Sequence, residues 1–228
     1  MKIRIEQVQQ RMATAALNAG RDPASVQCLA VSKLHPAASV RAAHACGLNA
    51  FGENYVQEGV DKIDALSDLR STLEWHCIGP VQSNKSKWVA SHFDWIQSLD
   101  SAKLARRLNE QRRVDQPPLN VCIQVNIDQG PTKSGLSPQD ATQLALSFAE
   151  WPRLRLRGLM CIPDPLPTRE QQEQVFAQAR DLFASWQDRG LPVDTLSMGM
   201  SDDLEAAVAQ GSTMVRIGTA IFGSRPTH

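Results

Sequence analysis

The sequence has no excess charge of either sign. Its 228 residues include 24 Lys+Arg and 24 Asp+Glu, so the formal net charge at neutral pH is zero. Proteins that bind nucleic acids or anionic membranes gain much of their affinity from positive charge, and the balance therefore argues against both kinds of partner. Hydrophobic residues make up 42% of the chain, which is the composition of an ordinary globular protein and not of a disordered one.

Long apolar runs are also missing. No window approaches the roughly 18 apolar residues of a membrane-spanning helix. The first residues, MKIRIEQVQQRM, place charged and amide side chains where a signal peptide needs its apolar core. We therefore expect a cytoplasmic protein without a membrane segment.

The cysteines do not form a recognisable pattern. There are five, an odd number, and no two are spaced as a CxxC pair; they are Cys28, Cys46, Cys77, Cys122 and Cys161. Four of them lie within apolar runs. We interpret all five as buried free thiols and predict neither a metal site nor disulfides.

Short β-type runs alternate with helical stretches along the whole chain. Apolar residues at three- and four-residue steps predict a first helix from about Ile5 to Ala19, ended by Gly20. Eight candidate strands follow, at 26–33, 49–54, 73–79, 95–100, 119–128, 154–162, 195–200 and 213–218.

Helix-boundary residues strengthen this alternation. Ser137 followed by Pro138 is typical of a helix start, and Thr168 with Gln171 forms a capping-box pattern. Pro36 opens another helix, which Gly47 closes, and Gly190 ends the helix that Thr168 begins. Eight strands that each precede a helix predict a parallel sheet closed into a barrel, with a doubly wound open sheet as the alternative. No repeat or linker divides residues 1–228, so we expect a single domain.

Polar residues gather where the strands end, which in a parallel barrel is the face that carries the chemistry. They are Lys33, Glu53, Asn54, Asn126, Ser201, Arg216 and Thr219, together with the glycines Gly79 and Gly218.

Lys33 is the candidate nucleophile. Period-two alternation sends Leu29, Val31 and Lys33 to the same side of the first strand, into the barrel. Burial there would lower the pKa of the ammonium group, and a neutral lysine amine attacks aldehydes. The alternative is a lysine that has left the strand and points into solvent.

The last two strands are followed by loops suited to an anion. Ser201 begins a helical stretch, and Gly218 and Thr219 follow the eighth strand, at the place where barrels often bind phosphate. Ser201 could instead be only an N-cap, and Gly218 only a turn residue. Together with Lys33, these loops indicate an aldehyde that carries a phosphate.

Arg216 lies just before Gly218 and Thr219, with Ile217 between, on an apolar strand. A guanidinium inside a barrel needs an acceptor. If the acceptor were a pyridine nitrogen, Arg216 would keep that nitrogen unprotonated and so weaken the ring as an electron sink. The alternative is an ion pair with a carboxylate such as Glu53.

The segments that carry these residues resemble a known family. They are LAVSK (29–33), FGENYVQE (51–58), EWHCIGPVQSNK (74–85), KSG (133–135), GLMCI (158–162) and SMGMSDDLEAAVAQGSTMVRIGTAIFGSR (197–225). Together they resemble the pyridoxal phosphate homeostasis protein family over nearly the whole chain. One departure is Pro80, where that family usually has histidine. This difference puts in doubt a functional role for the polar side chain at the start of this loop, but it does not affect the cofactor site.

The resemblance implies an α/β fold, a single (β/α)8 TIM-type barrel with an extra N-terminal helix, like the N-terminal domain of alanine racemase. It implies that pyridoxal 5′-phosphate (PLP) forms a Schiff base with Lys33. Ser201, Gly218 and Thr219 would hold the phosphate, Arg216 would face the pyridine nitrogen, and Asn54 would approach the phenolic edge of the ring.

The resemblance favours a PLP-binding homeostasis or carrier protein over an enzyme. A two-base racemase needs a second acid/base group, which alanine racemase takes from a tyrosine on a separate domain. Here the one tyrosine, Tyr55, follows the second strand, and the chain ends soon after the phosphate loop. We therefore expect a monomer that buffers PLP or delivers it to PLP-dependent apo-enzymes. A weakly active racemase is the alternative, and a phosphate-binding barrel without PLP is a third reading.

Other polar residues have simpler interpretations. Lys85 and Lys133 are rival aldehyde sites or helpers in cofactor transfer, although solvent exposure explains them equally well. His76 is expected to be a core histidine with its hydrogen bonds satisfied, and no metal site is predicted. The tryptophans at 75, 88, 95, 151 and 186 are expected to pack between strands and helices.

Overall fold

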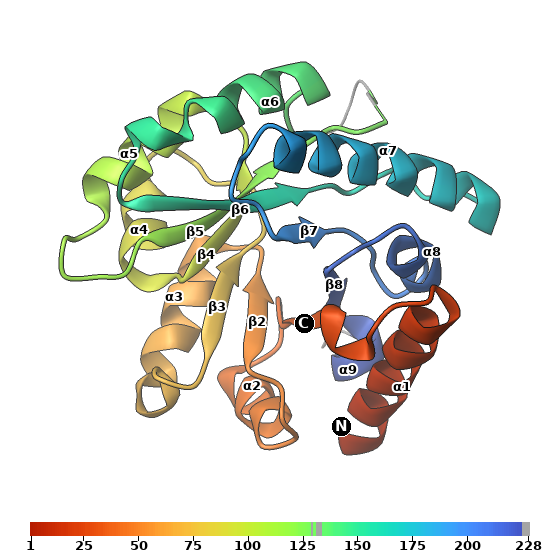
Figure 1. Ribbon diagram of the computed structural model, residues 1–228. Coiled ribbons are helices and arrows are strands. Elements are labelled where there is room, and N and C mark those ends of the chain that lie inside the picture. The colour runs from red at the N-terminus through yellow and green to blue at the C-terminus, as the bar shows by residue number, and fades with distance from the viewer. Residues whose placement is uncertain (129, 131–133, 225–228) are drawn as a thin grey trace.

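The computed structural model describes residues 1–128, 130 and 134–224, and within them eight parallel strands close into a barrel (Figure 1). The strands are β1 (Gln27–Val31), β2 (Ala50–Glu53), β3 (Glu74–Cys77), β4 (Trp95–Leu99), β5 (Leu119–Gln124), β6 (Leu154–Met160), β7 (Thr195–Ser197) and β8 (Met214–Ile217). Closure comes from β1 and β8, which pair in parallel with Gln27 opposite Met214 and Ala30 opposite Ile217. The predicted barrel is therefore confirmed, and the open-sheet alternative is wrong.

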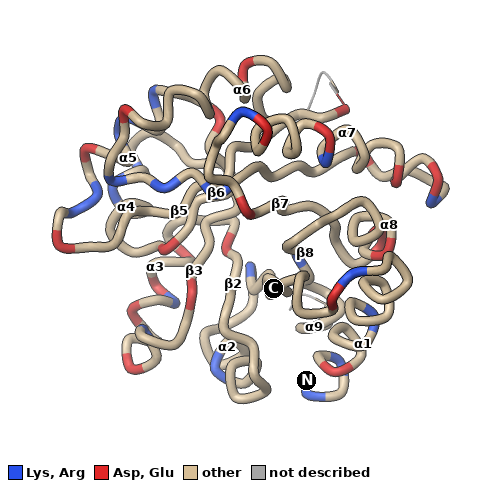
Figure 2. The backbone as a smooth tube through the Cα atoms, viewed as in Figure 1, with Lys and Arg blue, Asp and Glu red and all other residues tan. Residues whose placement is uncertain are grey.

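Helices surround this barrel. The α-helices are α1 (Lys2–Asn18), α2 (Ala37–His44), α3 (Val56–Ala65), α4 (Ser86–His92), α5 (Ala102–Gln111), α6 (Pro138–Leu146), α7 (Arg169–Asp188), α8 (Leu204–Ala209) and α9 (Thr219–Phe222). Short 3-10 turns cover Pro23–Ser25, Ser67–Leu69 and Phe148–Glu150. Basic and acidic residues are interspersed along the outer helices and do not gather at one end (Figure 2).

The predicted N-terminal helix is α1, which packs beside α8 and α9 (Figure 1). Its apolar face buries Ile5, Val8 and Met12, as the sequence spacing predicts. Arg11 on its polar face forms an ion pair with Glu205 of α8 at 2.9 Å. The extra helix thus covers the barrel next to the loops that follow β7 and β8.

The boundary residues act as the sequence predicts. Ser137 caps α6 by accepting a hydrogen bond from the amide of Asp140, and Pro138 occupies the first turn. Pro36 precedes α2, and Gly20 ends the α1 region with a φ of +68°. These local signals fix where several of the helices start and stop.

Thr168 offers a test of one such signal. Its hydroxyl accepts a hydrogen bond from the amide of Gln171 at the start of the 20-residue helix α7. We expect Thr168→Ala to lower the free energy of unfolding by about 1 kcal/mol and the melting temperature by roughly 2–4 °C, while Thr168→Ser retains both. Thermal unfolding followed by circular dichroism measures this. Equal stability of the alanine and serine variants would contradict the capping role.

The main core lies between the strands and the helices, and the barrel interior is packed separately. Inside the barrel, Leu29, Ala50 and Met214 form one small apolar cluster, with Ile78 packed against it. Trp95, Cys122 and Met160 form another. Polar side chains of β3, β4, β7 and β8 are buried in the same interior (0–5% exposed): His76, Gln97, Ser197 and Arg216.

Two predictions about the core need correction. Cys77, Cys122 and Cys161 are buried, but Cys28 and Cys46 are only half-buried; all five are free thiols. Trp95 packs inside the barrel, stacked on His76 with ring centroids 4.9 Å apart, and not between strand and helix. The reason is that it begins β4 on the face that points inward.

Two features are absent from the part of the chain that the structure describes. None of its helices combines the length and the apolar character that crossing a membrane requires. Among the same residues, no three His, Cys, Asp or Glu side chains are grouped as a metal site requires.

Candidate functional site

A cavity of about 410 Å³ opens at the carboxyl ends of the strands, where the following loops meet. It is lined by the six residues that the resemblance assigns to the cofactor: Lys33, Asn54, Ser201, Arg216, Gly218 and Thr219. Glu53, Gly79 and Asn126, which the sequence also placed at the strand ends, do not line it. Val31, Ile78, Ile162, Met200 and Asp202 complete its lining. A volume of this size is in the range of small-molecule sites.

Lys33 lies just beyond β1 and not within it. The strand ends at Val31, and Lys33 belongs to the following turn, where its side chain is half-buried. The expectation of a fully buried strand lysine is therefore wrong, although the side chain does reach the cavity. The turn is closed by a hydrogen bond from the amide of His35 to the carbonyl of Ser32 at 3.1 Å.

The turn contains a strained residue. Leu34, next to Lys33, has a φ of +64°, and it is the one non-glycine residue with positive φ in the described chain. Such a conformation costs a bulky residue free energy and persists only where its surroundings enforce it. Here the Leu34 amide donates a hydrogen bond to Glu58 at 2.5 Å, which ties the turn to α3.

Behind the turn lies a buried ionic cluster that the sequence reasoning missed. Lys62 of α3 donates to Glu53 Oε1, to Glu58 Oε1 and to the carbonyl of Ser32, each at 2.7 Å. Glu53 has no exposed surface, and its Oε1 also accepts from the Ser32 hydroxyl at 2.6 Å. Burial raises the pKa of the Glu53 carboxyl, although its contacts with Lys62 oppose the rise. The i, i+4 spacing of Glu58 and Lys62 was the available sequence signal.

Arg216 forms part of the cavity floor without an ion-pair partner among the described residues. Its Nη1 donates to both the carbonyl and the hydroxyl of Ser197, and its Nη2 donates to the carbonyl of Cys161, all at 2.8 Å. Burial lowers the pKa of this guanidinium from its ordinary value. The proposed ion pair with Glu53 is wrong, because Glu53 pairs with Lys62 instead. These three bonds leave one N–H on Nη2 and the N–H on Nε for a ligand.

Asn54 brings an unpartnered polar atom to the cavity. Its side-chain Oδ1 is buried and has no hydrogen-bond partner within the described structure. Its backbone passes so close to Gly79, in the segment after β3, that a Cβ on residue 79 would overlap the Asn54 carbonyl oxygen. Only glycine fits there. A buried acceptor without a partner is costly unless a ligand satisfies it.

The loops after β7 and β8 form the other wall. Gly199 has a φ of +96°, and a Cβ there would come within 2.5 Å of the Ala207 Cβ, so the turn to Ser201 requires glycine. Ser201 is not an N-cap, since α8 begins at Leu204 with Asp203 as its N-cap. Gly218 is the N-cap of α9, whose first amides have no acceptor within the helix.

Other residues considered from the sequence lie elsewhere. Lys85 precedes α4 and does not line the cavity, and neither does Pro80. Tyr55 is 57% exposed and is also absent from the lining. Lys133 falls outside the described residues. His76 is buried with both ring nitrogens hydrogen-bonded, as expected of a core histidine.

The apolar wall of the cavity was not predicted. Ile78, Ile162 and Met200 line it from the loops after β3, β6 and β7. Each lies at the carboxyl end of a predicted strand (73–79, 154–162 and 195–200), and that position was the signal in the sequence. Their side chains can pack against a ring, while the polar residues contact its substituents.

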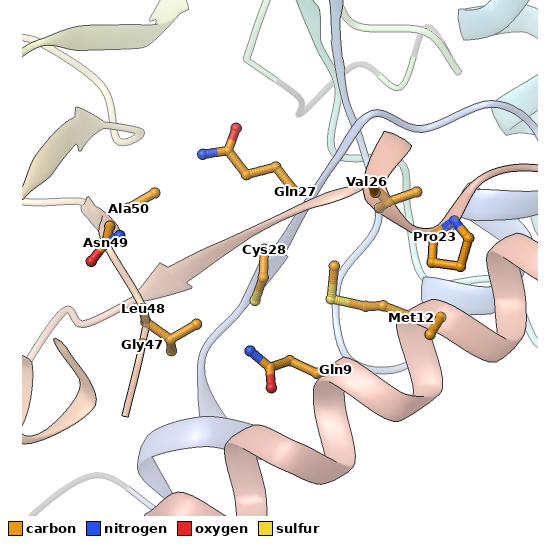
Figure 3. A pocket seen from close by; sticks show the side chains of 12 residues that line it. Gln9, Met12, Pro23, Val26, Gln27, Cys28, Gly47, Leu48, Asn49 and Ala50 are labelled. Atoms are coloured by element: carbon orange, nitrogen blue, oxygen red, sulfur yellow. The ribbon is translucent and has the colours of Figure 1, made fainter. Parts of the chain in front are cut away.

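A second cavity, of about 460 Å³, lies near the amino ends of β1 and β2. Figure 3 shows Gln9 and Met12 of α1 facing Cys28 and Leu48 across it. No charged side chain lines it, and burial raises the pKa of the Cys28 thiol to about 12. It therefore lacks the cation and the nucleophile that the first cavity offers.

Comparison with known proteins places the chain among relatives. The family model for the alanine racemase N-terminal domain matches residues 3–226. The pyridoxal phosphate homeostasis protein of Pseudomonas aeruginosa PAO1 is 55% identical over 221 residues, covering 97% of this chain and 94% of that protein. The protein of the same name from Escherichia coli K12 is 53% identical over 222 residues, covering 97% and 95%.

A solved structure of a PLP-bound protein is also similar to this chain. PipY of Synechococcus elongatus PCC7942, determined with PLP bound, superposes with a TM-score of 0.82 at 41% identity, covering 95% of this chain and 100% of that one. The chain therefore belongs to the pyridoxal phosphate homeostasis protein family, and it matches the alanine racemase N-terminal domain over residues 3–226.

Proposed function

We propose that this protein binds PLP in the cavity at the carboxyl ends of the strands and takes part in PLP homeostasis. One observation carries the proposal: a lysine amine, a buried guanidinium without a carboxylate partner among the described residues, and the loops after β7 and β8 line the same cavity. The names of the relatives and the PLP-bound PipY structure support it.

The residues present fit this cofactor. PLP supplies an aldehyde that forms a reversible imine with an amine, with loss of water. Lys33 would provide that amine. Ser201, Gly218 and Thr219 would hold the phosphate, and the Nε and Nη2 hydrogens that Arg216 has left would serve the ring nitrogen. The unpartnered Oδ1 of Asn54 would meet a polar group at the phenolic edge.

The role we propose is storage and delivery without catalysis. A reversible imine captures a reactive aldehyde and releases it by exchange with another amine. The half-buried position of Lys33 leaves the bond within reach of an exchanging amine. PLP-dependent apo-enzymes are the proposed recipients, and nucleic acids are not expected as partners because the net charge is zero.

A racemase is the alternative function, and the position of Tyr55 argues against it. A second acid/base group would have to line the cavity opposite Lys33. Tyr55 is 57% exposed and does not line it. Incubation of the PLP-loaded protein with L-alanine should leave the optical rotation unchanged. Enzyme-like racemisation that is lost in Lys33→Ala would contradict the carrier proposal.

Titration with PLP and with pyridoxal, followed by visible absorption, tests the proposed site. Both ligands carry the aldehyde, but only PLP carries the phosphate. We expect PLP to bind about 10- to 100-fold more tightly, because the loops after β7 and β8 donate charge-assisted hydrogen bonds to the phosphate. Equal affinity would argue against the phosphate site, and no binding of either ligand would argue against the cofactor.

We further propose that residues 1–228 act as one PLP-binding unit, as a monomer in the cytoplasm. The five free thiols are typical of a reducing compartment. Light scattering coupled to size-exclusion chromatography should give a mass near 25.1 kDa. Twice that mass would contradict the monomer.

A further inference from the structure

A continuous chain of hydrogen bonds crosses the barrel interior and ends at Arg216. The guanidinium Nη1 donates to Ser197 Oγ at 2.8 Å, and Ser197 Oγ donates to Gln97 Oε1 at 2.7 Å. Gln97 Nε2 then lies 2.9 Å from His76 Nδ1, and His76 Nε2 lies 2.9 Å from Glu74 Oε1. The chain thus connects β8, β7, β4 and β3, four strands distributed around the barrel.

When His76 is neutral, the chemistry of the two ends fixes the direction of every bond. Arginine only donates hydrogen bonds, and an ionised carboxylate only accepts them. Between them, Ser197, Gln97 and His76 must each accept once and donate once, always toward Glu74. The hydroxyl hydrogen of Ser197 therefore points to Gln97, and its lone pair is left for Arg216. The same logic places the proton of a neutral His76 on Nε2.

The environment makes this arrangement costly to disturb. His76, Gln97 and Ser197 have no exposed surface. If one of them were replaced, its neighbours in the chain would lose a hydrogen bond that water could not replace. Apolar clusters adjoin the chain, with Met214 near Gln97 and Trp95 stacked on His76. Burial of the Glu74 carboxyl opposes ionisation, but the contacts with His76, Trp95 and Gln27 together outweigh it, and the pKa falls to about 2.

We propose that His76, Gln97 and Ser197 are positioning residues that hold the Arg216 guanidinium toward the ring nitrogen of the cofactor. The inference rests on the proposed PLP site and names residues that do not line the cavity. Because His76, Gln97 and Ser197 stand between Glu74 and Arg216, the carboxylate does not contact the guanidinium, which keeps its remaining N–H groups for the ligand.

A purely structural role predicts a different result. If these side chains only filled the core, breaking the chain would weaken every ligand of the cavity equally. If they position Arg216, the loss appears only for a ligand with a ring nitrogen. The discriminating probe is the 1-deaza analogue of PLP, in which a C–H group replaces that nitrogen and the aldehyde and phosphate remain.

The experiment measures the affinities of PLP and 1-deaza-PLP for four proteins. These are the wild type, Gln97→Met, Ser197→Ala and a barrel-interior control, Met160→Leu. Methionine is unbranched and close to glutamine in length, so Gln97→Met removes the polar groups with little change of shape. Met160 is buried in the other apolar cluster and takes no part in the chain.

We expect Gln97→Met and Ser197→Ala to bind PLP about tenfold more weakly than the wild type, with the affinity for 1-deaza-PLP changed less than twofold. The control should match the wild type with both ligands. Equal losses for both ligands, or wild-type affinity in both variants, would overturn the inference. A wild type that binds both ligands equally would overturn it and leave the PLP site intact. Binding of neither ligand would refute the PLP proposal itself.

Discussion

Lys33→Ala is expected to abolish the visible absorption band that PLP produces with the protein and to weaken PLP binding by at least about 100-fold. Lys33 is the lysine that lines the cavity in the described chain, and alanine removes the amine that would form the imine. The phosphate loops and Arg216 remain, so residual noncovalent binding should persist. Absorption spectra during titration with PLP measure both effects.

Lys85→Ala is the matched control. Lys85 is another lysine of the carboxyl-end loops, but it precedes α4 and does not line the cavity. It should keep the wild-type band and affinity. A band that survives Lys33→Ala and disappears in Lys85→Ala would move the covalent site to the loop after β3.

The second large effect is expected in stability. Lys62→Met should lower the free energy of unfolding by about 3–5 kcal/mol at pH 7, because it leaves the buried Glu53 carboxylate without its cation. Lys62 and Glu53 are 7% and 0% exposed and lie 2.7 Å apart. Urea unfolding followed by tryptophan fluorescence measures the change.

This loss should depend on pH in a defined direction. Burial raises the pKa of Glu53 in the folded state, and removing Lys62 raises it further. A raised carboxyl pKa stabilises the fold below the unfolded pKa and destabilises it as pH rises through the folded pKa. The loss in the free energy of unfolding that Lys62→Met causes should therefore be smaller at pH 5 than at pH 7. A deficit independent of pH would contradict the role of Glu53.

Arg113→Met provides the control for this measurement. Arg113 forms an exposed ion pair with Asp115, and such pairs contribute little to stability. Its unfolding midpoint should match that of the wild type. A loss as large as that of Lys62→Met would mean that the assay responds to any removed cation.

The fold could be predicted from the sequence because its signals are local. Eight apolar runs alternate with helices, and capping residues such as Ser137 and Thr168 mark helix starts. Parallel strands with short connections allow few arrangements, and closure of eight of them is the common one. The placement of Lys33 and Arg216 at the carboxyl ends follows from that topology.

The contacts within the site could not be predicted in the same way. Lys33 lies in a turn in which Leu34 adopts a positive φ. Leucine disfavours positive φ, so the residue type gives no signal for this turn. Arg216 bonds to Ser197 and Cys161 and not to Glu53, because Glu53 is already paired with Lys62. The hydrogen-bond and ion-pair partners of these residues depend on which side chains meet across the barrel.

The hydrogen-bonded chain shows the same limit. His76 was correctly predicted as a core histidine, but its partners come from other strands. Gln97 is 21 residues away and Ser197 a further 100 residues. No spacing in the sequence indicates that these side chains meet, and only closure of the barrel brings them together.

The most direct test of the central claim is to map the covalent attachment of PLP. The protein is incubated with PLP, reduced with borohydride, digested and analysed by mass spectrometry. The account predicts a stable phosphopyridoxyl group on Lys33, with the unreduced protein showing a visible band that reduction removes. A label on another lysine, or a protein that stays colourless and unlabelled, would contradict it.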